Sequence, residues 1–146
     1  MKTKIFFLSL FALLLSSLNA NAGNCGEVAK KFEEMFNKMS ALVKNCNSLD
    51  ELENINFDNA IASVNMDNVD DDCLYATMTS SDKDIIRKSV MNFFDTFADR
   101  LSVMSGGLIS KDEARGAFAE MKSQVNGAIN SSKTYSDFFE AVNNLF

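Results

Sequence analysis

The sequence predicts an all-α fold, a small helical bundle of three long amphipathic helices and two or more short ones. Apolar residues recur at steps of three and four along three segments, which is the period of one helix face. At the start of four of the expected helices a serine or threonine stands three residues before an acidic residue, the spacing of the capping box that begins many helices. The 146 residues include no proline, the residue that breaks helices most strongly.

The first 22 residues have the pattern of a cleaved signal peptide. Two lysines among the first four residues form a basic start, and an apolar run, Ile5–Leu18, follows. Ala20–Ala22 has small residues at both ends, the positions that a signal peptidase reads. A run of this length is shorter than the ~20 residues that span a bilayer as a helix. We therefore expect secretion, to an extracellular or periplasmic location, and a single all-helical domain over residues 23–146.

Charge limits the partners expected for the mature chain. The whole sequence has 14 basic and 20 acidic residues. Cleavage would remove Lys2 and Lys4 but no acidic residue, which leaves 12 basic residues and a net charge of −8. Such a chain is repelled by phosphate backbones and by anionic membrane surfaces. Nucleic acid is therefore not an expected partner, and a membrane is disfavoured.

Residues 26–45 are expected to form the first long helix, because a wide apolar stripe repeats along them at helical spacing. The stripe consists of Val28, Phe32, Met35, Phe36, Met39, Leu42 and Val43. The polar residues Asn45 and Asn47 are expected to end this helix.

Ser48 and Glu51 form a capping box, so a short helix is expected to follow through about residue 54. Asparagines at positions 54, 56 and 59 then weaken the helical pattern, since their side chains compete for backbone hydrogen bonds. The apolar residues Phe57, Ile61 and Val64 restore helical spacing for about two turns. Whether residues 48–65 form one kinked helix or two pieces stays open.

The segment 65–72 is polar and is expected to be a loop. Its aspartates favour the start of a short helix over about residues 73–78, since acidic side chains stabilise helix N-termini. Clustered carboxylates are also the ligands of Ca²⁺, and the candidates are Asp67, Asp70, Asp71 and Asp72. The segment lacks the glycine and the distal glutamate of an EF-hand loop, so we expect no metal site.

Residues 81–107 are expected to form the central helix, on which the two outer arms pack. Its apolar stripe consists of Ile86, Val90, Phe93, Phe94, Phe97, Leu101 and Met104. Ser81 and Asp84 have the spacing of a capping box, and Gly106 and Gly107 supply the left-handed conformation that ends helices.

Ser110 and Glu113 form the capping box of a third long helix. Its apolar stripe consists of Ala114, Ala117, Phe118, Met121, Val125, Ala128 and Ile129. Thr134 and Asp137 cap a last short helix. This helix carries the apolar residues Tyr135, Phe138, Phe139, Val142, Leu145 and Phe146.

The two outer arms resemble each other at an offset of 86 residues, which suggests an internal duplication. The identical residues are Glu27, Phe32, Glu34 and Met35, which align with Glu113, Phe118, Glu120 and Met121. Any two amphipathic helices can be slid into partial register, so chance remains the alternative. If the arms are equivalent, the first and third long helices run parallel and the central helix is antiparallel between them. Cys46 and Cys73 would then lie at the same end of the bundle.

The three cysteines Cys25, Cys46 and Cys73 predict one internal disulfide and one spare thiol in an oxidising compartment. Cys25 and Cys46 bracket the first helix, whose rise of 1.5 Å per residue separates them by about 32 Å, beyond disulfide reach. The bridge should therefore include Cys73. We expect Cys46–Cys73, with Cys25–Cys73 as the alternative. In the first case Cys25 would be free to link a second chain in a covalent homodimer.

The usual catalytic sets are missing from the sequence. It has no histidine, no G-x-S-x-G segment and no C-x-x-C pair, and no glycine-rich loop that would cradle a phosphate. We therefore expect no enzyme activity, no catalytic residue and no cofactor. The sequon Asn130-Ser131-Ser132 would accept a glycan at Asn130 in a eukaryotic secretory pathway.

Phenylalanine and methionine are abundant on the predicted stripes and provide the candidate interaction residues. These are Phe36, Met39, Phe93, Phe94, Phe97, Phe118, Met121, Phe138 and Phe139. They form either an ordinary core or an apolar surface or cavity. On the second interpretation, the chain is a secreted non-enzymatic protein that binds a protein partner or a small apolar ligand. The alternative is a membrane-active secreted effector with amphipathic helical hairpins.

The dozen residues from Cys73 to Asp84 resemble the segment of secretoglobins that leads from a cysteine into a helix. Secretoglobins are small secreted helical proteins with apolar cavities. The rest of the chain departs from that family, because it is longer, lacks the cysteine that should close the helix near its end, and has a whole further arm. No function and no site residue is therefore carried over from this resemblance.

Overall fold

The computed structural model describes residues 25–66, 69 and 71–145, and over these residues the protein is an all-α bundle, as predicted. The elements are η1 (Cys25–Glu27), α2 (Val28–Asn45), α3 (Leu49–Glu53), α4 (Asp58–Ala62), η2 (Asp71–Tyr75), α5 (Ser80–Met104), α6 (Lys111–Ala117), α7 (Ala119–Ser131) and α8 (Tyr135–Asn143). The expected signal peptide, residues 1–22, lies outside the described residues.

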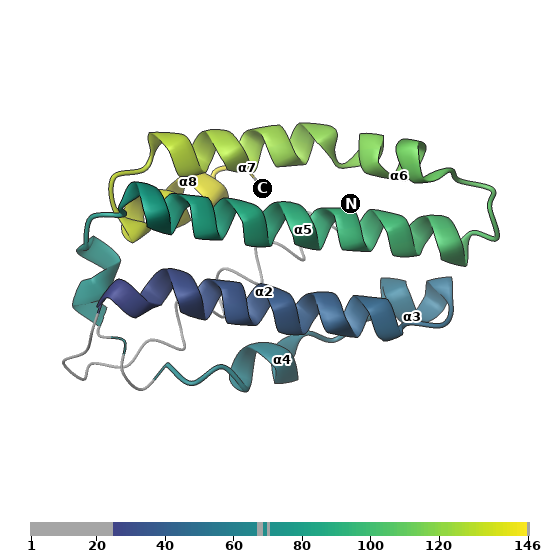
Figure 1. Ribbon diagram of the computed structural model, residues 1–146, viewed down its shortest axis with the longest axis horizontal. Coiled ribbons are helices and arrows are strands. Elements are labelled where there is room, and N and C mark those ends of the chain that lie inside the picture. Colours follow the sequence, from purple (N-terminus) through teal and green to yellow (C-terminus); the bar gives the residue numbers. More distant parts are fainter. Residues whose placement is uncertain (1–24, 67–68, 70, 146) are drawn as a thin grey trace.

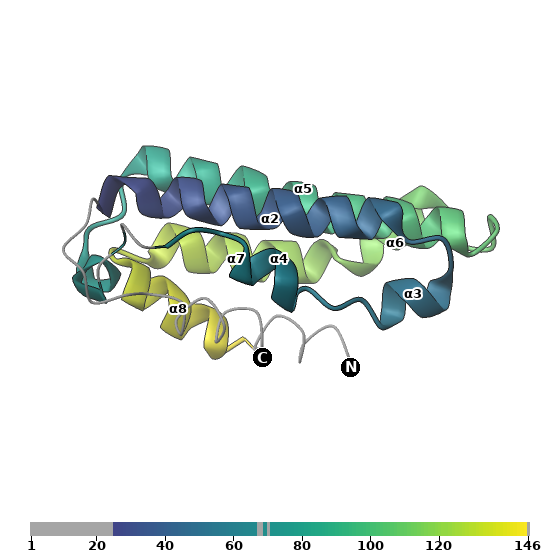
Figure 2. The same cartoon turned by 90° about the horizontal axis from the view of Figure 1, so that it is seen from below.

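The two longest helices, α2 and α5, lie side by side and run in the same direction (Figure 1). At their far ends the Arg100 guanidinium donates to the carbonyl oxygen of Cys46, with Nε 2.8 Å from that oxygen. The predicted antiparallel arrangement of these two helices is therefore wrong. The reason is that α3 and α4 lead back along α2 before α5 begins (Figure 2).

The segment 48–65 forms two separate helices, which settles the question that the sequence left open. The Ser48 hydroxyl accepts a hydrogen bond from the backbone N–H of Glu51 at 3.2 Å, as expected for a cap. Between the helices, the Asn54 amide donates to the carbonyl oxygen of Asp50 at 2.9 Å. The Asn56 side chain accepts from the N–H of Asp58 at 2.8 Å. Asparagine side chains thus bond to the backbone where the first helix ends and the second begins.

The cap of the central helix α5 is Thr79, two residues before the predicted cap Ser81. The Thr79 hydroxyl accepts from the N–H of Asp82, and the Asp82 carboxylate accepts from the N–H of Thr79, both at 3.0 Å. Thr79 and Asp82 have the same spacing as Ser81 and Asp84, so the pattern alone does not choose between the two boxes. At the other end, Gly106 and Gly107 have φ angles of 66° and 85°, which confirms the predicted left-handed stop.

The predicted third long helix is interrupted at Phe118 and consists of α6 and α7. The cap is confirmed, because the Ser110 hydroxyl accepts from the N–H of Glu113 at 3.2 Å. At the break the N–H of Phe118 donates to the carbonyl oxygen of Arg115, three residues back, at 3.1 Å. Both helices run opposite to α5, and therefore opposite to α2 (Figure 1). The parallel arms expected from a duplication are contradicted by this arrangement.

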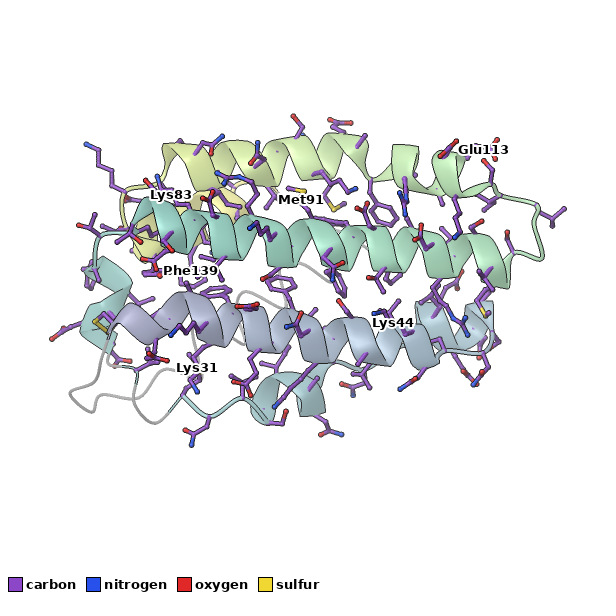
Figure 3. The ribbon with its side chains drawn as sticks, viewed as in Figure 1. Lys31, Lys44, Lys83, Met91, Glu113 and Phe139 are labelled. Atoms are coloured by element: carbon purple, nitrogen blue, oxygen red, sulfur yellow. A yellow bond between two sulfur atoms is a disulfide. The ribbon has the colours of Figure 1, made fainter. Side chains whose placement is uncertain are left out.

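The disulfide joins Cys25 to Cys73, with Cα atoms 5.1 Å apart. The favoured pairing Cys46–Cys73 is therefore wrong, and the alternative is confirmed. The chain after α2 returns along it through α3 and α4, and η2 lies at the end where α2 begins, where the sulfur–sulfur bond is visible (Figure 3). Cys46 is a free, buried cysteine beyond the other end of α2. Cys25 is consequently not a free thiol that could link a second chain.

The core fills the space around α2 and α5 and is mainly aromatic. The largest fully buried side chains are Tyr135, Phe32, Phe36, Phe93, Phe94, Phe138, Met35, Met39 and Leu52. The N-terminus of α8 lies next to the N-terminus of α5, because the N–H of Met78 donates to the carbonyl oxygen of Lys133 at 2.8 Å. This junction places α8 under the first turns of α2, where Phe32 meets Tyr135.

Candidate functional site

The predicted phenylalanine and methionine residues come together, but in the interior. Seven of the nine are buried, and Phe97 and Met121 are half-buried. One ring cluster surrounds Phe93, which packs against Phe36 and Phe57 with centroids 5.8 and 5.9 Å apart. A second cluster joins Phe32 to Phe139 at 5.7 Å. In this conformation the set is core, so a partner or ligand would reach it only after part of the bundle moves.

Exposed apolar side chains gather instead at the end of the bundle where α2 and α5 finish. The group, named here the apolar tip, consists of Leu49, Val103, Leu108 and Ile109. Leu108 is 90% exposed and Val103 is 53% exposed. The elements that carry these residues, namely α3, the end of α5 and the α5–α6 loop, lie at the same end of the molecule in both views (Figures 1 and 2). Exposed apolar groups of this kind mark interaction surfaces when they form a patch.

Sequence reasoning missed the apolar tip, although a signal was present. Ten consecutive residues from Leu101 to Ser110 carry no charge, and five of them are apolar. The two glycines in this stretch indicated that the helix ends inside it. Apolar residues beyond a helix end are not on a helical stripe, so nothing in the pattern predicts their burial.

The loop that presents Leu108 is held in one conformation by serine hydroxyls. The hydroxyl of Ser102 donates to the carbonyl oxygen of Ile109 at 2.7 Å, although Ser102 itself is buried on α5. The hydroxyl of Ser105 donates to the carbonyl oxygen of Ser102 at 2.7 Å and accepts from the N–H of Ile109 at 3.1 Å. The tip is therefore preorganised, which reduces the conformational entropy that a binding event would cost.

Acidic side chains predominate around the apolar tip. The exposed acids on α3 and in the first turn of α6 are Asp50, Glu51, Glu53, Asp112 and Glu113. The cations on the neighbouring turns are Lys44, Arg100 and Lys111, and Arg100 already donates to a backbone carbonyl. Figure 3 shows Glu113 on α6 and Lys44 on α2 at this end of the bundle. A partner for the tip should therefore present an apolar centre with a basic rim.

Helix α6 packs against α5. Of its seven residues, Ala114 is the one that is buried. Arg115 donates from Nε and one Nη to the two Asp99 carboxylate oxygens, both at 2.8 Å. This hydrogen bonding lowers the pKa of Asp99 below its ordinary value. The two side chains are 47% and 32% exposed, so the pair is worth at most about 1 kcal/mol.

A small pocket lies at the opposite end, beside the disulfide. Its walls are Val28, Phe32, Met66, Val69, Cys73, Leu74, Tyr135 and Phe139. The centre of a water molecule could move within a volume of about 10 Å³ inside this pocket. That volume is about the minimum for one bound water. In this conformation the pocket is therefore too small for a lipid or another organic ligand.

Tyr135 is the polar residue of this pocket. Its hydroxyl is buried and makes no hydrogen bond of acceptable geometry. Burial raises the pKa of Tyr135 far above its ordinary value, and the nearby Asp82 carboxylate raises it further. The phenol therefore stays protonated at physiological pH.

Ser40 on α2 is the second buried hydroxyl without a hydrogen-bond partner among the described residues. We expect Ser40→Ala to raise the free energy of unfolding by about 1 kcal/mol, because an unsatisfied buried hydroxyl costs more than a methyl group. Urea denaturation followed by circular dichroism measures this change. Ser89→Ala on α5 is the matched control, because the Ser89 hydroxyl donates to the carbonyl oxygen of Ile85 at 2.8 Å. Equal gains from both variants would contradict the prediction.

The free Cys46 is expected to be unreactive in the native protein. Burial raises the pKa of its thiol, and Glu51 raises it further against the opposing effect of Arg100. A smaller thiolate fraction and a buried sulfur both slow alkylation. Reaction with Ellman's reagent should therefore be more than about tenfold slower in the native state than in guanidinium. Comparable rates in the two states would show that Cys46 is accessible.

The described residues contain no group of three metal-ligating side chains of the kind that could hold a metal ion. Among the same residues, no helix is long and apolar enough to cross a membrane. The disulfide between Cys25 and Cys73 is typical of an oxidising compartment.

The predicted glycosylation residue Asn130 lies in the last turn of α7 and is exposed. Its side-chain oxygen accepts a hydrogen bond from Arg87 at 2.6 Å. The hydroxyl of Ser132, the third sequon residue, is turned inward and donates to the carbonyl oxygen of Ala128. A glycan on Asn130 would be attached to the side-chain nitrogen, which leaves the oxygen that accepts from Arg87 in place.

Comparisons with known proteins do not indicate a function for this chain. The short resemblance of residues 73–84 to secretoglobins gains no support from them. No protein-family model, no curated protein and no solved structure matches this chain.

Proposed function

We propose that this chain is a secreted, non-enzymatic protein that binds a protein partner through the apolar tip. Secretion is supported by the leader pattern of residues 1–22 and by the disulfide. Binding rather than catalysis is supported by the lack of histidine and by the surroundings of the two titrating groups in the interior, Cys46 and Tyr135. Burial favours the protonated form of each, so neither is prepared to act as a nucleophile or a base.

The observation that carries the proposal is the exposure of Leu108. An apolar side chain that is 90% exposed on a flexible loop would need no explanation, because single exposed leucines are common. Here the loop is fixed by Ser102 and Ser105, and Val103 and Ile109 are further exposed apolar residues at the same end of the bundle. An apolar anchor that is already held in place resembles the central residue of a protein interface, with polar residues at its rim.

A bilayer is the less suitable partner for the same patch. Leu108 and Ile109 together would bury eight side-chain carbons, at about 0.8 kcal/mol each. A myristoyl chain of fourteen carbons already gives only marginal membrane binding. The acids around the tip would weaken binding to anionic lipids further. The membrane-active alternative is therefore disfavoured, and it remains an outcome of the experiment below.

Site-specific photo-crosslinking tests this proposal. A photoreactive phenylalanine analogue replaces Leu108 in one variant and Tyr75 in another. Tyr75 is the matched control, because it is 73% exposed but lies on η2 at the opposite end. Both proteins are illuminated in the secreted fraction of the source organism. We expect a discrete protein adduct from position 108 and none from position 75.

The other outcomes of this experiment overturn the proposal. Equal adducts from both positions would indicate nonspecific contact, and adducts with lipid alone would assign the tip to a membrane. A lack of adducts at position 108 would show that the tip has no partner in that fraction.

A further inference from the structure

We propose that the partner of the apolar tip is a basic protein surface, and that Glu51 and Glu113 are the residues that select it. This inference rests on the protein interface proposed above and adds the chemistry of the partner. Three observations support it, namely the position of the two glutamates on helices that begin at the tip, the hydrogen bonds that fix their carboxylates, and the ion pairs of the bundle, which involve other acids.

Each glutamate lies close in sequence to an exposed apolar residue of the tip. Leu49 is the first residue of α3, and Glu51 follows two residues later. Ile109 stands immediately before Ser110, the N-cap of α6, and Glu113 lies in the first turn of that helix. Both helices lie at the end of the bundle where α5 finishes (Figures 1 and 2), and Figure 3 shows Glu113 there. A partner that covers the tip would therefore come within reach of both carboxylates.

Hydrogen bonds hold both carboxylates in place. The Glu51 carboxylate accepts from the N–H of Asn47 at 2.7 Å. The Glu113 carboxylate accepts from the N–H and from the hydroxyl of Ser110, both at 2.8 Å, and these bonds lower its pKa below the ordinary value. All three bonds end on Oε2, so the Oε1 atom of each exposed glutamate can accept from a partner. Acceptors that are fixed in advance lose little conformational entropy when a cation binds them.

Neither glutamate is neutralised by an ion pair among the described residues. Asp99 shows the contrast, because Arg115 donates to both of its carboxylate oxygens. The other acids in described ion pairs are Glu27, Glu34, Asp84 and Asp95. Around the tip, five exposed acids stand against three cations, and one of these, Arg100, already donates to a backbone carbonyl. The two glutamates therefore keep a negative charge that a partner can use.

This arrangement selects one class of partner. Lysine or arginine side chains of the partner would pair with Glu51 and Glu113, while an apolar centre between them covers Leu108. A second copy of this chain would bring the same acids, so like charges would face each other across the interface. The phosphates of nucleic acids and of anionic lipids are disfavoured for the same reason.

Two synthetic helical peptides provide the probe for this charge preference. Both have the same leucine-rich apolar face, and the polar face carries lysine in one peptide and glutamate in the other. NMR of the isotope-labelled mature chain, residues 23–146, locates and quantifies binding. We expect the lysine peptide to shift the amides of Val103, Leu108 and Ile109 and to bind about tenfold or more tightly than the glutamate peptide. Equal binding of the two peptides, no binding of the lysine peptide, or shifts confined to another region would overturn the proposal.

Charge-removing substitutions assign the preference to the two glutamates. Glu51→Gln and Glu113→Gln should each weaken binding of the lysine peptide about two- to fivefold, the effect of one exposed ion pair. Glutamine also occurs at this position of capping boxes, so both helices keep their caps. Asp137→Asn is the matched control, because Asp137 accepts from the N–H of Thr134 in the capping box of α8, at the opposite end of the bundle. Unchanged binding in the glutamine variants, or an equal loss in Asp137→Asn, would overturn the assignment.

The crosslink from position 108 separates the failure of this inference from the failure of the proposed function. A protein adduct together with equal binding of the two peptides would keep the interface and reject only the basic partner. A lack of any adduct would reject both. When an adduct forms, mass spectrometry of the linked segment should find lysine or arginine within about one helical turn of the crosslinked residue. A linked segment rich in acidic residues would contradict the inference and leave the interface in place.

Discussion

Phe93→Ala is expected to lower the free energy of unfolding by about 4 kcal/mol, a large part of the stability of a domain of this size. Phe93 is the centre of the larger ring cluster and is 1% exposed. It packs against Phe36 of α2 and Phe57 before α4, and also against Phe94 and Phe97 of its own helix. Loss of the ring would leave a cavity where α2, α4 and α5 meet. Urea denaturation followed by circular dichroism measures the effect.

Leu108→Ala is the control for Phe93→Ala, because it removes an apolar side chain that is almost fully exposed. It should change the free energy of unfolding by no more than about 0.5 kcal/mol. If Phe93→Ala also cost less than about 1 kcal/mol, the cluster would be able to collapse around the missing ring. The ring contacts described above would then not be the main source of stability in the bundle.

The helices were predictable because their signals are local. The apolar stripe of α2 and the capping boxes at Ser48, Ser110 and Thr134 depend on residues within a few turns of one another. The direction of α5 relative to α2 depends instead on the path of residues 46–79. That segment has weak periodicity and a run of asparagines and aspartates, so the sequence did not indicate how far it travels.

The disulfide was assigned to the wrong pair for the same reason. The length of α2 excludes Cys25–Cys46, and Cys73 is in the bridge as predicted. The choice between Cys46 and Cys25 depended on the assumed direction of α5. Because α3 and α4 lead back along α2, Cys73 lies next to Cys25 and far from Cys46.

The wide apolar stripe of α5 is explained by burial on two sides of the helix and not by a binding site. Phe93 faces α2 and α4, while Phe94 faces Phe118 at the junction of α6 and α7. A helix covered on two sides needs apolar residues at adjacent positions, which explains the pair Phe93-Phe94 without a ligand. The break at Phe118 had a weaker signal, the glycine at position 116, and glycine alone does not locate the end of a helix.

Removal of the disulfide in the double variant Cys25→Ala/Cys73→Ala is expected to lower the free energy of unfolding by about 4 kcal/mol. The two cysteines are 48 residues apart in sequence, and the bridge restricts the unfolded chain by closing that loop. The link also holds η2 against the first turn of α2, where Cys73 is buried. Replacement of both cysteines avoids a new free thiol, which would exchange with Cys46 in the unfolded state. The measurement is urea denaturation of both proteins without reductant.

Cys46→Ala distinguishes this pairing from the one that the sequence favoured. If Cys46 is free, the substitution removes one buried sulfur and should cost less than about 1.5 kcal/mol. If Cys46 were bonded to Cys73, the same substitution would cost as much as the double variant, and Cys25 would react with a thiol reagent in the native protein. The ranking of the two variants therefore tests the return path of residues 46–72, because only that path brings Cys73 to the beginning of α2.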